Sequence, residues 1–245
     1  MTPNPPRHRV QGGRTTTPVR IPIGGPLLLG DLGSPPEPHG LVLFAHGSGS
    51  SRHSPRNQYV AGVLEREAFA TLLIDLLTED EEVIDERTSQ YRFDLPMLAD
   101  RLVAIIDWLA GRPDVAGLPI GLFGASTGAG AALMAAAARP QRVAAVVSRG
   151  GRPDLAGSML ARVTAPALLI VGGLDTPVIR MNRDAMAQMP GEVQLEIVPG
   201  ATHLFEEPGT LEQVARLAAG WFSRYLTAAF DARAAVSGPA ANRVK

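Results

Sequence analysis

Short apolar runs alternate with stretches of helical periodicity along most of the chain. The apolar runs lie at 40–47, 71–77, 120–126, 143–151, 167–173 and 194–200. Because they do not alternate between apolar and polar positions, they are typical of strands that are buried on both faces of a sheet. The helical patterns lie between these runs, at about 58–68, 95–111, 127–138, 179–189 and 210–227.

The stretch 95–111 illustrates the helical pattern. Its leucines and isoleucines recur at positions 98, 102, 105, 106 and 109, and Gly111 followed by Pro113 ends the run. Upstream, VRIPIG and PLLLGDL predict a pair of antiparallel strands. Regular alternation of strands and helices predicts an α/β fold, in which helices cover both faces of a mostly parallel sheet.

Ligands of such open sheets bind at the carboxyl ends of the strands, so the residues that follow each predicted strand are the candidates for chemistry. In chain order they are His46-Gly47-Ser48-Gly49, Asp75, Ser126, Arg149-Gly150-Gly151, Asp175 and His203. This set contains a serine, an acid and a histidine. A histidine oriented by an acid can take the proton of a serine hydroxyl and thereby make it a nucleophile.

Ser126 lies between Gly124 and Gly128, after a predicted strand and before a predicted helix. One interpretation is a turn of small residues where a helix crosses close to a sheet. The other is a nucleophile on a sharp strand-to-helix turn, where glycines permit close approach of the backbone. In that second case the backbone N–H of Thr127 can donate to an oxyanion.

The acid and the base also have alternative interpretations. His203, in PGATHLF, could cap the last helix, and Asp175, in VGGLDTPV, could be a turn or N-cap residue before Pro177. Asp154 competes with Asp175 because it follows the preceding predicted strand. We prefer Asp175, since only a two-residue turn separates it from its strand. His203 is the histidine that follows both the serine and an acid at a sheet end.

Composition excludes several classes of protein. The 245 residues include no cysteine, which excludes disulfides, thiolate metal sites and a cysteine nucleophile. A formal net charge of −1 gives no attraction to nucleic acid or to an anionic membrane. No stretch reaches the roughly 20 apolar residues of a membrane helix, and the N-terminus lacks the apolar part of a secretory signal, so the cytoplasm is expected. We expect a disordered leader at 1–17, one domain at 18–228 and a flexible tail at 229–245.

The loops say less about a ligand. The stretch 78–96 is the longest one interpreted as irregular; it could border the site, but its acidic residues favour a solvated loop. About fifteen residues around Asp154 separate two predicted strands, which leaves no room for a cap domain. Arg52, Arg56 and Arg149 could hold an anionic substrate group or pair with neighbouring acids. The sequence has no metal-ligand spacing and no phosphate-binding loop, so we expect no metal and no cofactor.

With these motifs the chain resembles the α/β-hydrolases and, among them, the dienelactone-hydrolase-like branch. The resemblance rests on GASTG, GLDTP, GATH and FAHGSGS, and it extends over about 18–228. It implies that Ser126 is the nucleophile, Asp175 the acid and His203 the base. It also implies that Ser48, the residue after His-Gly, donates its backbone N–H to an oxyanion. Dienelactone hydrolase itself has a cysteine nucleophile, so the serine of this chain argues against dienelactone as the substrate.

The sequence therefore predicts a cap-less α/β-hydrolase that cleaves an ester, thioester or lactone of a small molecule through an acyl-enzyme intermediate. Arg52 and Arg149 are the candidate substrate contacts. A peptidase or an acyltransferase would use the same three residues. The competing class is a non-catalytic member of the fold that binds a ligand or a protein in the same pocket, because fold alone does not determine function. The oligomeric state is left open.

Overall fold

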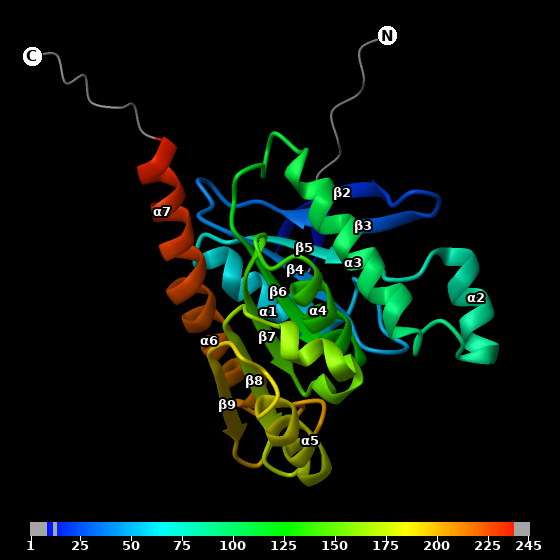
Figure 1. Ribbon diagram of the computed structural model, residues 1–245. Helices are drawn as coiled ribbons and strands as arrows, with labels where there is room; N and C mark the ends of the chain where they lie inside the picture. The colour runs from blue at the N-terminus through cyan, green and yellow to red at the C-terminus, as the bar shows by residue number, and fades with distance from the viewer. Residues whose placement is uncertain (1–8, 12–13, 238–245) are drawn as a thin grey trace, which may run out of the picture.

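The computed structural model describes residues 9–11 and 14–237. Its strands are β1 Arg9–Gln11, β2 Arg14–Pro22, β3 Leu27–Gly33, β4 Leu41–Ala45, β5 Ala70–Ile74, β6 Ile120–Ala125, β7 Val143–Arg149, β8 Ala167–Gly172 and β9 Val193–Val198. The described residues form a nine-stranded sheet in the order β1-β2-β3-β5-β4-β6-β7-β8-β9 (Figure 1). From β5 to β9 neighbouring strands are parallel, whereas β1, β2 and β3 are antiparallel and β3 joins β5 antiparallel. The predicted mostly parallel sheet is confirmed.

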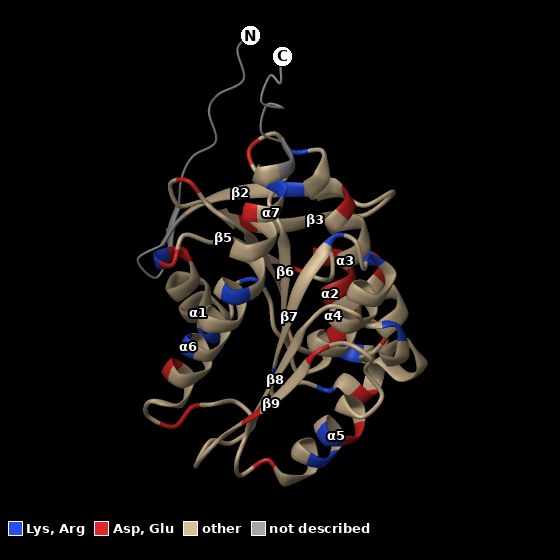
Figure 2. Ribbon diagram, turned by 60° about the vertical axis from the view of Figure 1, so that its left-hand side comes forward, with Lys and Arg blue, Asp and Glu red and all other residues tan. Residues whose placement is uncertain are grey.

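Helices cover both faces of this sheet. They are α1 Pro55–Arg66, α2 Glu79–Thr88, α3 Leu95–Ala110, α4 Thr127–Ala138, α5 Thr176–Met186, α6 Thr210–Phe222 and α7 Ala228–Ser237, with the 3₁₀ helix η1 Pro153–Arg162 and the π-helical turn η2 Ser223–Thr227. In the view of Figure 2, α1 and α6 lie on one side of the strands, and α3, α4 and α5 lie on the other. Among the described helices, none is long and apolar enough to cross a bilayer.

Burial on both faces explains the apolar runs. On β6, the buried Leu122 belongs to the hydrophobic cluster under α3 and α4, while its neighbour Phe123 belongs to the cluster under α1 and α6. Successive side chains of a strand point to opposite faces, so both positions must be apolar. Burying each such side chain contributes about 1.5–3 kcal/mol. The sheet is thus a rigid support for the loops at its carboxyl edge.

The stretch 78–96, which we expected to be a loop, contains the helix α2. Its N-cap Thr78 and Glu81 form a capping box, and each side chain bonds the backbone N–H of the other. Four acidic residues occupy the first turn, where negative charge is favoured by the helix dipole. Glu81 is also paired with Arg101 of α3. The acidic run is therefore a capped helix rather than a loop, and Glu79, Asp80 and Glu86 are exposed to solvent as expected.

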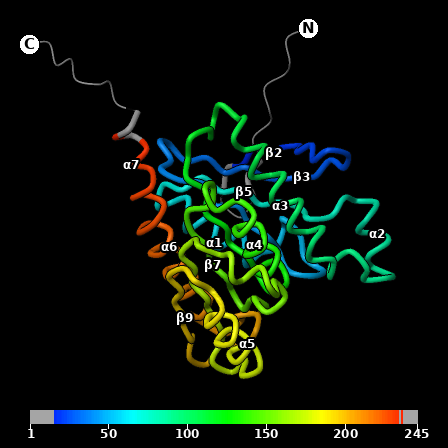
Figure 3. The backbone as a smooth tube through the Cα atoms, in the orientation of Figure 1, coloured from blue at the N-terminus to red at the C-terminus, as the bar shows by residue number. Residues whose placement is uncertain are grey.

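The structure also moves both expected domain boundaries. β2 begins at Arg14 and pairs with β3, so part of the expected leader 1–17 belongs to the sheet. At the other end, η2 continues α6 into α7, so the helical path extends to Ser237 within the expected tail 229–245 (Figure 3). Residues 1–8, 12–13 and 238–245 lie outside the described part of the chain.

Candidate active site

Ser126 lies on a strained turn between β6 and α4. Its φ of 51° and ψ of −122° are sparsely populated for a residue with a side chain. A Cβ on Gly124 would lie 2.4 Å from the Cα of Ala129, and a Cβ on Gly128 would lie 2.4 Å from the carbonyl oxygen of Ala45. β6, α4 and the end of β4 therefore approach too closely for side chains at the two glycines. The glycines fix the turn that presents Ser126.

Asp175, His203 and Ser126 form a hydrogen-bonded series at the carboxyl edge of the sheet. The Nδ1 of His203 lies 2.6 Å from the Oδ2 of Asp175, and its Nε2 lies 3.4 Å from the Oγ of Ser126. Because a carboxylate accepts but does not donate, Nδ1 carries the proton and Nε2 is free to accept one. The side chain of Asp175 is 14% exposed and that of His203 is 38% exposed. The imidazole is thus open to a substrate while its acid is sheltered.

Two glycines bring the loops of the acid and the base together. A Cβ on Gly172, at the end of β8, would lie 2.4 Å from the carbonyl oxygen of Ala201. A Cβ on Gly150, after β7, would lie 2.9 Å from the carbonyl oxygen of His203. The backbone N–H of Leu174 also donates to Ala201 at 2.9 Å. The packed backbone holds the imidazole in position before any substrate binds.

Asp154 does not join this series. It lies in η1, and its carboxylate accepts two hydrogen bonds from the guanidinium of Arg152, at 2.9 and 2.7 Å. These bonds raise the pKa of Arg152. The structure therefore brings Asp175, and not Asp154, to His203.

Ser48 and Thr127, the two residues expected as oxyanion donors, lie together. The register pairs Ala45 of β4 with Gly124 of β6, so the loops after both strands begin at the same level. However, the backbone N–H of Ser48 donates to the Oγ1 of Thr127 at 3.0 Å, and the two hydroxyl oxygens are 2.9 Å apart. Thr127 is the first residue of α4, and such a position has no intrahelical acceptor for its N–H. In the free protein, the N–H of Ser48 is therefore already hydrogen-bonded, whereas the N–H of Thr127 has no acceptor within its own helix.

His46 has a structural role that the sequence did not indicate. Its Nε2 accepts the backbone N–H of Leu76 at 3.0 Å, so its Nδ1 must donate to the carbonyl oxygen of Gly47, 2.9 Å away. The side chain is buried, and burial lowers its pKa. A neutral His46 thus ties the loop that carries Ser48 to the end of β5. The position of a histidine directly after a strand was the available signal.

Arg52 and Arg149, the two arginines expected as substrate contacts, differ in their hydrogen-bond and charge partners. Arg52 is paired with Asp75 through its guanidinium and its backbone N–H, and its Nε lies 3.4 Å from Asp31. Arg149 is buried and contacts the Oδ1 of Asn57 at 3.5 Å. Burial, and then the charge of Arg56, lower the pKa of Arg149 to about 10. Arg52 therefore pairs with neighbouring acids, whereas Arg149 has no acid beside it among the described residues.

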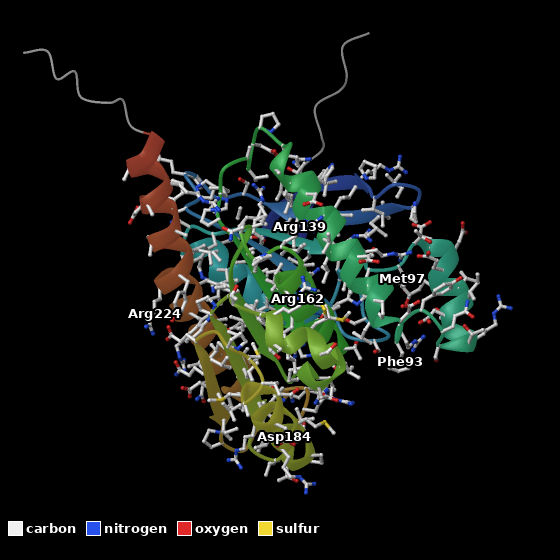
Figure 4. The ribbon with its side chains drawn as sticks, in the orientation of Figure 1. Phe93, Met97, Arg139, Arg162, Asp184 and Arg224 are labelled. Carbon is white, nitrogen blue, oxygen red and sulfur yellow. The ribbon has the colours of Figure 1, made fainter. Side chains whose placement is uncertain are left out.

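A cleft of about 620 Å³ lies beside the loop that carries Ser48. Ser51 and Asp75 line it together with Leu27, Leu29 and the acidic start of α2. Phe93, which is 58% exposed, lies on the connection between α2 and α3 (Figure 4). A smaller cavity is lined by Glu82 and Asp85 of α2 together with Ser48 and Thr127, so the missed helix lies close to the two expected oxyanion donors. Within the described residues, no group of three or more histidine, aspartate or glutamate side chains is arranged to hold a metal.

Comparisons with known proteins identify the family and the fold of the chain. The model of the dienelactone hydrolase family matches residues 59–230. A crystal structure of dienelactone hydrolase from Anabaena variabilis is 59% identical, covers 87% of this chain and 99% of its own, and has a TM-score of 0.86. Est1E from Butyrivibrio proteoclasticus is 18% identical, covers 84% and 98% of the two chains and has a TM-score of 0.70, which shows a common fold.

Two curated relatives from strains of Mycobacterium tuberculosis are 60% identical over 205 residues, and their name assigns them provisionally to the phosphoribosyl transferases. The match covers 83% of this chain and 45% of each relative, so the chain spans about half their length. The fold comparisons confirm the expected α/β-hydrolase fold. The chain therefore belongs to the dienelactone hydrolase family of hydrolases.

Proposed function

We propose that the protein is a serine hydrolase that cleaves an ester, thioester or lactone of a small molecule through an acyl-enzyme intermediate. The observation that carries the proposal is the hydrogen-bonded series from Asp175 through His203 to Ser126. The strained turn at Ser126 and the membership of a hydrolase family support it. A binding protein has no need of this strain, which costs of order 1–3 kcal/mol.

In the first proposed step, the Oγ of Ser126 attacks the acyl carbon while the Nε2 of His203 takes its proton. The 3.4 Å between these atoms is long, as is common before a substrate binds. Asp175 holds the required tautomer and stabilises the imidazolium that forms. The imidazolium then protonates the leaving group. In the second step His203 activates a water, which hydrolyses the acyl group from Ser126.

The oxyanion of each tetrahedral intermediate would accept hydrogen bonds from the backbone N–H groups of Thr127 and Ser48. The N–H of Ser48 must first exchange the Oγ1 of Thr127 for the oxyanion. A negatively charged oxygen is the stronger acceptor, so this exchange is favoured when charge develops in the transition state. The donor would then contribute more to the transition state than to the bound ester, which is the condition for raising kcat.

A panel of 4-nitrophenyl esters, aryl thioesters, lactones and peptide amides tests the proposal. The wild type should hydrolyse at least one of the acyl compounds with a burst of the leaving group, and a fluorophosphonate probe should label Ser126. A binding protein with an unactivated serine would give neither turnover nor labelling. Transfer to an added alcohol in preference to water would identify an acyltransferase, and cleavage of amides alone would identify a peptidase.

The name of the mycobacterial relatives raises phosphoribosyl transfer as a second candidate. A match of 205 residues within 245 must include residues 41–205, and therefore all three members of the series. The dienelactone hydrolase family model covers much of the same stretch. We propose that the activity in that name resides in the part of the relatives that this chain does not match. Release of pyrophosphate from phosphoribosyl diphosphate by this protein would contradict this assignment.

A further inference from the structure

Arg149, at the end of β7, is a buried cation, and no acid of the described part of the chain lies beside it. It is 7% exposed, and its Nε has no hydrogen-bond partner within the described residues. Its guanidinium contacts the Oδ1 of Asn57 at 3.5 Å. A buried charge without a charged partner is costly to a fold. Such a group is expected where its charge serves binding or catalysis.

A second guanidinium lies beside the first. Arg56 comes from the first turn of α1, next to Asn57, and the charge of Arg56 disfavours protonation of Arg149. The Nε of Arg56 is also buried and has no hydrogen-bond partner among the residues that the structure describes, while its Nη1 contacts Glu206 at 3.1 Å. The Glu206 side chain is 63% exposed. An exposed pair of this kind contributes about 0–1 kcal/mol, so Glu206 is readily displaced.

The two arginines border the candidate active site. The carbonyl oxygen of Arg149 accepts the backbone N–H of Ser126 at 3.2 Å, and the next residue, Gly150, packs against His203. Glu206 lies three residues after His203 on the same loop. The start of α1, a helix of 12 residues, adds the positive end of its dipole to this corner. A group bound to Ser126 and a group bound to the arginines can therefore belong to one small molecule.

We propose that Arg149 and Arg56 bind an oxyanion, a carboxylate or a phosphate, that the substrate carries in addition to its scissile acyl group. Each guanidinium offers a planar fork of donors that matches two oxygens of such a group. Glu206 occupies one of these donors in the free protein and leaves when the substrate enters. The assignment of the anion to a substrate rests on the proposed hydrolase function, whereas binding of the anion does not.

The kinetic test compares mono(4-nitrophenyl) succinate, which carries a free carboxylate, with its methyl ester, and 4-acetoxybenzoate with its methyl ester. Arg149→Met should raise KM for at least one of the two anionic esters roughly 10- to 100-fold and leave that of its neutral partner within about twofold. Glu206→Gln should lower KM for the same anionic ester, because it removes the competing carboxylate. Arg162→Met removes an exposed arginine of η1 (labelled in Figure 4) and should change none of these values.

A binding measurement on the Ser126→Ala variant needs no turnover. Succinate or inorganic phosphate should raise its melting temperature, and the added substitution Arg149→Met should abolish that rise while the protein still folds. If Arg149→Met fails to fold, the opposite change expected from Glu206→Gln still decides the question. Equal loss of activity toward anionic and neutral esters, or a melting temperature that the anions do not change, would overturn the proposal. Stabilisation by anions without preference for either anionic ester would refute the assignment to a substrate.

Discussion

Around Ser126 the backbone itself holds the geometry, whereas around Ser48 side-chain hydrogen bonds do so. The Ser126 turn depends on a positive φ and on two glycines that admit no Cβ. The loop of Ser48 depends on the hydroxyl of Thr127 and the imidazole of His46. A turn fixed by close backbone packing has few alternative conformations, while a loop fixed by a few hydrogen bonds can exchange them. The rigid turn would present Ser126 as the nucleophile. The loop of Ser48 could exchange its hydrogen bonds when negative charge develops in the site.

The largest effect is expected from Ser126→Ala. The alanine keeps the Cβ and the strained backbone, so the melting temperature should stay close to that of the wild type. Loss of the nucleophile should lower kcat by about 10⁶, as in other serine triads. Steady-state kinetics and thermal melting of the same preparation check both parts. Turnover close to normal would remove Ser126 from the mechanism.

Asp175→Asn should lower kcat by about 10⁴, because an amide no longer fixes the tautomer of His203 or stabilises its imidazolium. Asp154→Asn is the matched control, since Asp154 pairs with Arg152 in η1. Its loss should cost at most about 1 kcal/mol of unfolding free energy and leave kcat nearly unchanged. A crossed result, in which Asp154→Asn is the inactive variant, would mean that the acid is assigned wrongly.

The turn at Ser126 was predictable because its signals are local. GASTG follows an apolar run and precedes an alanine-rich stretch, so the turn could be inferred from consecutive residues. The assignment of Asp175 needed only its place directly after β8. The helix α2 was missed because its stabilisation comes from a capping box and from Arg101 of α3, rather than from an apolar face. The sequence did not indicate that Glu81 in this acidic run pairs with a residue of another helix.

The oxyanion region was less predictable because its contacts cross the fold. His46 meets Leu76 only because β4 and β5 are neighbours in the sheet. The bond from Ser48 to the Thr127 hydroxyl joins residues 79 positions apart. The contact between Arg149 and Asn57 likewise joins the end of β7 to the first turn of α1, 92 positions away. Hydrophobic periodicity identifies strands and helices, but it does not indicate which polar side chains meet across them.

Gly128→Ala tests the close backbone packing around Ser126. The new Cβ would lie 2.4 Å from the carbonyl oxygen of Ala45, so β4 or α4 must move. We expect a loss of about 1–3 kcal/mol of unfolding free energy and at least a 100-fold decrease in kcat, because the nucleophile shifts from its position. Gly220→Ala, where a Cβ meets nothing within 4 Å, is the control and should be neutral or stabilising. Full activity in Gly128→Ala would show that the close approach is dispensable.

Thr127→Val tests the side-chain hydrogen bond that holds the loop of Ser48. Valine has nearly the shape of threonine but cannot hold the N–H of Ser48, so the loop should lose its position opposite Ser126. We expect kcat to fall roughly 10-fold with little change in KM, while Thr127→Ser, which keeps the hydroxyl, should resemble the wild type. The two variants should be compared at saturating substrate. An increase of kcat in Thr127→Val would mean that the hydroxyl only blocks the Ser48 donor and does not position it.

The smallest effect concerns His46 and the dependence of stability on pH. Burial lowers the pKa of His46 from the value of 6.5 that it has in the unfolded chain. As the pH falls below 6.5, the unfolded chain therefore binds a proton more readily than the folded protein, and the free energy of unfolding decreases until the folded pKa is passed. Glutamine can replace both hydrogen bonds but does not titrate. We expect His46→Gln to cost about 1 kcal/mol at pH 7.5, because its bonds are less well aligned.

Denaturant unfolding of wild type and His46→Gln between pH 7.5 and pH 5 checks this expectation. The difference between the two proteins should shrink as the pH falls, because the wild type loses a contribution that the variant never had. His53→Gln, at an exposed position near the same loop, should run parallel to the wild type. Parallel curves for His46→Gln would show that folding does not lower the pKa of His46, so that the bond from Leu76 to its Nε2 contributes nothing to stability. The oxyanion loop would then owe its position to Thr127 alone.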